Sequence, residues 1–132
     1  MISSIINSSV SGLRAAELRM GTAASNITNA NSTSTTHADG SKTAAYQPKH
    51  VEQTSLGSGG VSARQVATQP ASLAVFAPDA AGADNQGNVD VPNISLSAEA
   101  VEMKMADVAY RASLKTIDVA DEMLGEILDA KT

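Results

Sequence analysis

Residues 101–130, VEMKMADVAYRASLKTIDVADEMLGEILDA, contain the pattern that decides the fold. Apolar side chains recur there mostly at steps of three and four, which is typical of a helix that packs along another helix. The members of this series are Val101, Met105, Val108, Ala112, Val119, Met123, Ile127 and Ala130. No proline interrupts residues 97–131, so we expect one helix of roughly 50 Å at 1.5 Å per residue.

The same segment has a second apolar face, made of Tyr110, Leu114, Ile117, Leu124 and Leu128. A helix in a simple two-helix hairpin needs only one apolar face. A compact globule of this chain length is about 36 Å across, which is shorter than the expected helix. Either the helix breaks near Asp118–Asp121, or other subunits cover its apolar ends. We favour the second alternative, because no proline interrupts the segment.

The first residues of the chain predict a partner for this helix. Apolar side chains again follow helical spacing, with Ser9 as an interruption: Ile6, Leu13, Ala16, Met20, Ala23, Ile27 and Ala30. Gly12 and Gly21 each cost a helix roughly 1 kcal/mol relative to alanine, but they leave flat places where another backbone can approach. Residues 1–31 are slightly basic and residues 96–132 are acidic, which favours pairing of the two helices. The alternative is that these charges are simply solvated.

The segment between the helices has little to bury. Residues 31–43 (NSTSTTHADGSKT) predict a loop or disorder. Strand-like pieces follow, separated by glycine and proline: Tyr46–Thr54, Gly60–Gln69, Ser72–Ala77 and Asn88–Ile94. So small a β unit is barely stable alone and should pack on a helix or a neighbour. We therefore expect a mainly α fold: helices in 1–31 and 96–132 pair as a coiled-coil-like hairpin, with a small irregular β unit in 32–95.

Composition and motifs argue against an enzyme. The chain is 42% hydrophobic but only 2% aromatic, so a large self-sufficient core is hard to build. There is no cysteine, and His37 and His50 have no carboxylate at a ligand-like offset. Asp84 and Gly87 do not have the spacing of a calcium loop, and no phosphate-binding glycine motif occurs. We expect no catalytic, cofactor-binding or metal-binding residues.

The sequence also argues against several partners and locations. No basic patch with interleaved aromatics is present, so we expect no nucleic-acid binding. No apolar run is long enough to span a bilayer, so we expect no direct membrane insertion. Residues 1–30 lack the basic and continuous apolar regions of a cleavable signal peptide.

Three ordered motifs resemble one family. SGLRAAELRM (11–20) and ASNITNAN (24–31) resemble the N-terminal signature of bacterial flagellar rod and hook proteins. In the middle, AVFAPD (74–79), ADNQGNV (83–89) and PNI (92–94) are similar to proximal-rod subunits of the FlgC type. The closing stretch YRASLKTIDVADEML (110–124) is similar to the ending of the same family. Departures from the family pattern include Phe76 and Asn88, where tyrosine is usual.

The resemblance implies a structural subunit of the flagellar proximal rod. Such subunits are exported unfolded by the flagellar type III apparatus without a cleaved signal. They assemble helically, between the membrane-embedded ring and the distal rod, into a hollow drive shaft around the export channel. The implied partners are other copies of the chain, proximal and distal rod subunits, the adaptor between rod and MS ring, and the export apparatus.

Eleven residues are the candidates for packing and assembly: Leu13, Met20, Ile27, Val101, Met105, Val108, Leu114, Ile117, Met123, Leu124 and Ile127. Two alternatives stay open. A B-type proximal rod subunit shares both ends of the chain but not the middle motifs. A soluble secretion chaperone or adaptor could present a similar helical hairpin to a client.

Overall fold

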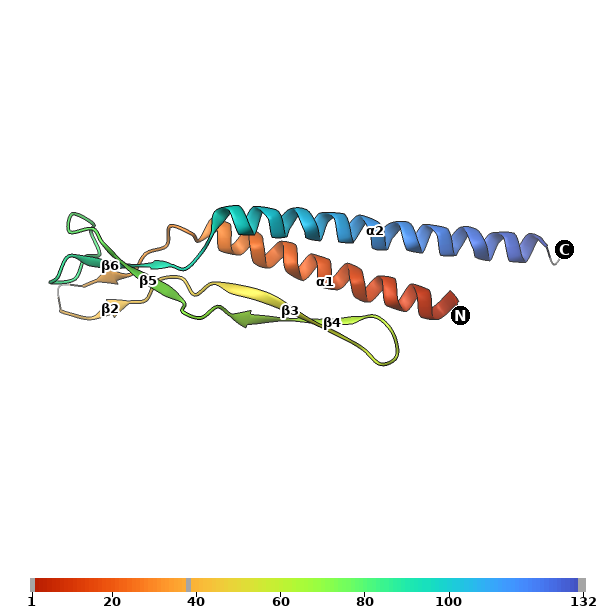
Figure 1. Ribbon diagram of the computed structural model, residues 1–132, viewed down its shortest axis with the longest axis horizontal. Coiled ribbons are helices and arrows are strands. Elements are labelled where there is room, and N and C mark those ends of the chain that lie inside the picture. Colours follow the sequence, from red (N-terminus) through yellow and green to blue (C-terminus); the bar gives the residue numbers. More distant parts are fainter. Residues whose placement is uncertain (1, 38, 131–132) are drawn as a thin grey trace.

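The computed structural model describes residues 2–37 and 39–130, and it is elongated rather than globular (Figure 1). Helix α1 (Ile2–Thr28) and helix α2 (Leu96–Asp129) lie side by side, and a β-hairpin runs along the opposite side of α1. The remaining strands lie beyond the end where α1 stops and α2 starts (Figure 1). Residue 1 and residues 131–132 of the predicted terminal units lie outside the described residues.

The expectation of a mainly α protein holds only in part. Of the described residues, 48% are helical and 22% are in strands. The two helices do pack against each other, as expected, and α2 is continuous through 118–121. The β part is larger than predicted because the polar segment 31–43 also forms strands.

Three separate two-stranded antiparallel sheets make up the β part. Strands β3 (Lys49–Ser55) and β4 (Val61–Ala67) pair over their full length, from Lys49 opposite Ala67 to Ser55 opposite Val61. Strands β5 (Ser72–Phe76) and β6 (Asn88–Pro92) pair in the same way. These four strands lie where the sequence predicts them, with ends shifted by up to three residues.

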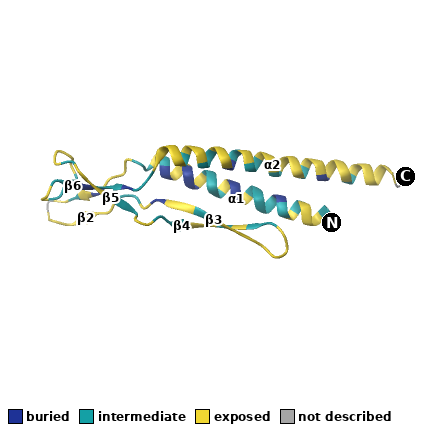
Figure 2. Ribbon diagram, in the orientation of Figure 1, coloured by how far each residue is buried: buried dark blue, intermediate teal, exposed yellow. Residues whose placement is uncertain are grey.

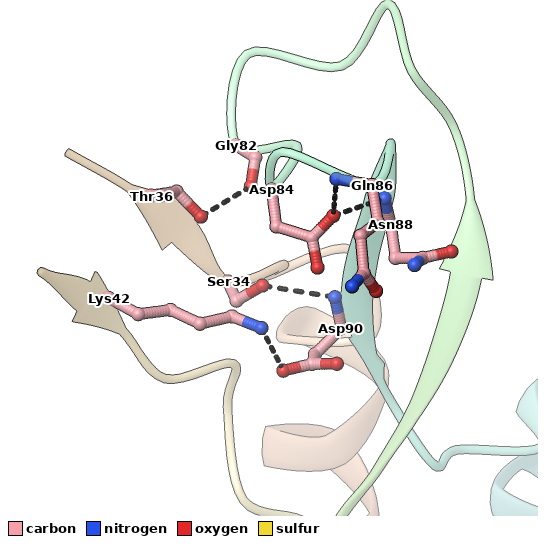
Figure 3. A network of polar contacts seen from close by, with 8 residues as sticks. All are labelled: Ser34, Thr36, Lys42, Gly82, Asp84, Gln86, Asn88 and Asp90. Atoms are coloured by element: carbon pink, nitrogen blue, oxygen red, sulfur yellow. Dashed lines mark hydrogen bonds and ion pairs between the residues drawn. The ribbon is translucent and has the colours of Figure 1, made fainter. Parts of the chain in front are cut away.

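The prediction of a loop or disorder over residues 31–43 needs correction. It contains the short pair β1 (Thr35–Thr36) and β2 (Lys42–Thr43). Ser34 is fully buried, its backbone N–H donates to the Asp90 carbonyl, and its hydroxyl accepts from the Asp90 N–H at 3.0 Å (Figure 3). Lys42 pairs with the Asp90 carboxylate at 2.6 Å. Strand β6 therefore orders this segment through polar contacts, which apolar periodicity does not reveal.

The ends of both helices follow local sequence. Ser95 caps α2, since its hydroxyl accepts from the backbone N–H of Ala98 at 3.4 Å. The start of α2 at Leu96 agrees with the predicted start of the C-terminal helix at residue 96. Helix α1 ends at Thr28, three residues before the end of the predicted helical unit 1–31.

Small residues form the contact between the helices. A Cβ atom added to Gly12 would lie 2.8 Å from the Ser113 hydroxyl of α2, so the two backbones approach closely there. On the same face of α1, Ser9, Ala16 and Ala23 follow at steps of three, four and seven, and all are buried. In α2 the buried residues are Ala106 and Ala120. Figure 2 shows burial concentrated on α1, between α2 and the hairpin, and largely absent from the outside of α2.

The hairpin β3–β4 is attached to α1 through side-chain hydroxyls. The Ser11 hydroxyl accepts the Val61 backbone N–H at 3.0 Å, and Gln65 donates to the Thr22 hydroxyl at 2.9 Å. Gly60, with φ +89°, precedes Val61 and has no room for a Cβ beside Ser11. Helix α1 therefore forms the middle layer, with α2 on one side and the hairpin on the other.

Candidate assembly surface

A row of apolar side chains, interrupted at residues 115–116, lies exposed on α2. We call this row the outer seam; it consists of Val101, Met105, Val108, Ala112, Val119, Met123 and Ile127. The exposed fractions of its valine, methionine and isoleucine side chains range from 42% to 60%. Contiguous apolar surface of this kind marks an interaction site on a folded protein.

The inner face of α2 explains why the outer seam stays uncovered. The residues turned toward α1 are chiefly small or half-buried: Glu102, Ala106, Ala109, Ser113, Ile117, Ala120 and Leu124. Small side chains permit close approach to Gly12 and Ala16 of α1, where the larger valines and methionines would not fit. The helix therefore uses its less hydrophobic face inside the molecule and leaves the more hydrophobic one outside.

The eleven predicted residues divide into two groups. Five are half-buried within the molecule: Leu13, Met20, Ile27, Ile117 and Leu124. Six are exposed: Val101, Met105, Val108, Leu114, Met123 and Ile127. Sequence periodicity found both groups but did not show which face of α2 meets α1. Their role in assembly stays a prediction.

The last turns of α2 extend past the start of α1 (Figure 1). Within residues 116–129 there are five acidic residues and no basic one: Asp118, Asp121, Glu122, Glu126 and Asp129. Met123 and Ile127 lie four residues apart on one face, and Glu122 and Glu126 form a parallel acidic row beside them. The end of α2 is thus an apolar strip with a negative flank.

Asn26 joins three elements at the other end of the helices. It is 1% exposed and its Nδ2 donates to the Lys49 carbonyl at 2.7 Å and to Glu99 Oε1 at 2.8 Å. Its Oδ1 accepts the Lys49 N–H and the Tyr46 hydroxyl, both at 3.2 Å. Asn26 therefore uses two donors and two acceptor positions, its full capacity, to fix α1, α2 and β3 together. Asn26 was not predicted as a functional residue from the sequence. The signal that could have indicated it is an asparagine next to Ile27 and near Ala23, within an apolar helical pattern.

An ion pair between Arg19 and Glu102 lies beside this junction. The hydrogen bond from Arg19 holds the pKa of Glu102 below its usual value, and burial partly opposes that shift. The same bond raises the pKa of Arg19. Because this pair joins α1 to α2, it helps fix their register.

The strands at the far end form a turn-rich unit (Figure 3). Asp84 accepts the backbone N–H groups of Gln86 and Asn88 at 2.9 and 2.8 Å, which lowers its pKa. Phe76 is 71% exposed at this end. Asp84 is engaged with its own turn, so the residues that faintly resembled a calcium loop have a structural role.

Chemical sites are sparse in the described part of the chain. No group of three histidine, cysteine or acidic residues that could hold a metal ion occurs within residues 2–37 and 39–130. His50 lies in β3, and its Nε2 is 3.8 Å from Glu52 Oε1. None of the helices in the described ranges is long and apolar enough to cross a membrane.

Comparison with known protein families gives a match to part of the chain. Residues 85–130 match the family described as "Flagellar basal body rod FlgEFG protein C-terminal". The matched segment is less than half of the chain, but it contains all of α2 and hence the whole outer seam. A search of curated proteins finds none that matches this chain.

Proposed function

We propose that this chain is a structural subunit of the bacterial flagellar basal-body rod. The outer seam carries the proposal: α2 pairs with α1 through small residues and presents its larger apolar residues outward. A protein that works alone has little reason to expose such a row. A rod subunit has neighbours that cover it.

The match of residues 85–130 to a rod protein family supports the same function, because the matched segment includes that seam. The N-terminal motifs SGLRAAELRM and ASNITNAN support it independently, since they lie outside the matched residues. The finer proposal is the proximal rod, as a subunit of the FlgC type. It rests on the middle motifs at 74–79, 83–89 and 92–94.

In this function the terminal helices assemble helically into a hollow shaft that transmits torque and surrounds the export channel. The chain reaches its place in the periplasmic part of the basal body through the type III export apparatus, without a cleaved signal peptide. Its partners are other copies, proximal and distal rod subunits and the adaptor to the MS ring. The B-type proximal rod subunit is the nearest alternative, and a helical-hairpin chaperone or adaptor is the alternative outside this class.

The test is complementation of a strain of the source bacterium that lacks the coding sequence. A tagged wild-type chain should restore swimming and copurify with basal bodies. Val108→Asp, which puts a charge into the outer seam, should be exported and yet fail to join the basal body.

The matched control is Ala100→Asp, since Ala100 is an exposed residue of α2 outside the outer seam. It should swim normally. A chaperone or adaptor would instead remain in the cytoplasm with a client and never copurify with basal bodies, which would refute the proposed function.

A further inference from the structure

A groove lined by residues of α1, β4 and the hairpin turn lies on the face of α1 that meets the hairpin. Apolar side chains make up most of its lining, namely Ala15, Leu18, Leu56, Val61 and Ala63, and Ser11, Arg14 and Ser62 complete it. Leu56, at the tip of the hairpin, is 45% exposed. The groove therefore offers apolar surface that the molecule itself leaves open.

Arg14 supplies a positive charge at this groove. It is exposed, and it has no ion pair with any residue in the described ranges. Among the residues that line the groove, Arg14 is the one that carries a charge, whereas the nearby Arg19 pairs with Glu102 and Arg64 pairs with Glu52. An acidic, apolar segment would complement such a surface.

The end of α2 has that character. Met123 and Ile127 form an exposed apolar strip, and Glu122 and Glu126 flank it. We propose that residues 119–129 of a second copy of this chain occupy the groove. Met123 and Ile127 pack against Leu18 and Leu56, and the acidic row lies toward Arg14.

The chain's own α2 cannot make this contact, because α2 and the hairpin lie on opposite sides of α1 (Figure 1). The groove and the α2 end are different surfaces, so each copy offers one of each to its neighbours. A contact between two different surfaces is heterologous. Repeated from copy to copy, it forms a closed ring if the rotation closes and an open helical filament if it does not. The inference deepens the proposed assembly function and rests on it for its biological meaning.

The test uses the absence of cysteine from the chain. Leu56→Cys and Ile127→Cys are made as separate full-length variants, one of them labelled with heavy nitrogen, then mixed and oxidised. We expect a mixed disulfide dimer at least five-fold more abundant than the homodimers of either variant. The control mixture replaces Leu56→Cys with Phe76→Cys, which puts the thiol at the exposed apolar residue of the opposite end.

Charge changes test the electrostatic part. Arg14→Glu in the Leu56→Cys variant should reduce the mixed dimer at least five-fold, and Glu126→Arg in the other variant should restore it. Arg64→Glu makes the same charge change outside the groove lining and should leave the yield unchanged. Circular dichroism of each variant separates loss of contact from loss of fold.

The groove contact would be overturned if Ile127→Cys formed disulfides with Phe76→Cys, or with itself, as abundantly as with Leu56→Cys. It would also be overturned if Ile127→Cys formed no disulfide with Leu56→Cys. That result would leave the proposed rod function intact if the chain still copurified with basal bodies. Conversely, a specific mixed dimer from a chain absent from basal bodies would keep the contact and refute the rod.

Discussion

Replacing Asn26 with alanine tests whether one side chain fixes the junction of α1, α2 and β3. The change removes four hydrogen bonds and leaves both backbone polar groups of Lys49 without their partners. A buried polar group left unpaired costs about 1–3 kcal/mol. Alanine returns up to about 0.7 kcal/mol through its better helix propensity.

Two of the four partners are partly compensated. The Tyr46 hydroxyl retains a contact with Ser25 at 3.0 Å, and Glu99 is only half-buried, so water can reach it. The main loss therefore comes from the backbone N–H and C=O of Lys49, and because Lys49 is itself exposed we expect Asn26→Ala to lower the free energy of unfolding by about 1–2 kcal/mol. Urea unfolding of the monomeric chain, followed by circular dichroism, measures this loss.

The matched control is Asn7→Ala, which changes an exposed asparagine in the same helix and should be neutral or slightly stabilising. Amide exchange adds a local readout, because the Lys49 N–H donates to Asn26 and should exchange faster in the variant. A loss below about 0.5 kcal/mol, the usual effect of a surface change, together with unchanged exchange at Lys49, would refute the reasoning.

Three further predictions concern the helix pair. The pKa of Glu102 is lowered in the folded state because Arg19 donates a hydrogen bond to its carboxylate. The stability that this pair contributes is therefore present above the ordinary pKa of 4.5 and is lost as the pH falls through the folded-state pKa. The difference in unfolding free energy between wild type and Glu102→Gln should shrink from pH 7 to pH 3, and a constant difference would contradict the pairing. Ile117→Asp, at a half-buried position facing α1, should destabilise the purified chain and abolish rod incorporation. Val108→Asp, in the exposed outer seam, should change thermal unfolding little. Equal melting temperatures for the two variants would show that the inner face of α2 and the outer seam are not distinct. The last turns of α2, which extend past the start of α1 (Figure 1), should show little amide protection in the dilute chain; protection as strong as that at Ala106 would mean that something in the single molecule covers them.

The terminal helices and four of the strands could be predicted because each has its own local signal. Three–four spacing over most of the segment and the absence of proline predict α2, and Ser95 supplies its cap. The glycines and prolines between apolar runs specify the hairpins. Periodicity also gave α2 two apolar faces, which is the basis of the assembly hypothesis.

The choice between those faces could not be predicted, because hydrophobicity ranks Val108 and Met105 above Ala106 and Ser113. The structure inverts that order, since contact with Gly12 requires small side chains. Packing complementarity between two distant segments decides the interface, and neither segment encodes it alone.

Hydrogen bonds between distant polar residues are the other feature that could not be predicted from the sequence. Ser34 and Asp90 order the segment predicted as a loop, and Asn26 fixes the helix–hairpin junction. These contacts join residues far apart in the sequence and depend on geometry that composition does not specify. A polar residue within an apolar pattern is the only trace of such a contact in the sequence.

The central claim is that the outer seam is open in the single molecule and covered in the assembly. Methionine oxidation measures this directly. Met105 and Met123 lie in the outer seam and are 55% and 47% exposed. Met20 and Met103 are half-buried and serve as references. In the purified monomer Met105 and Met123 should oxidise faster than Met20 and Met103, and in isolated basal bodies that difference should disappear. Slow oxidation of Met105 and Met123 in the monomer, or undiminished oxidation in the basal body, would contradict the account.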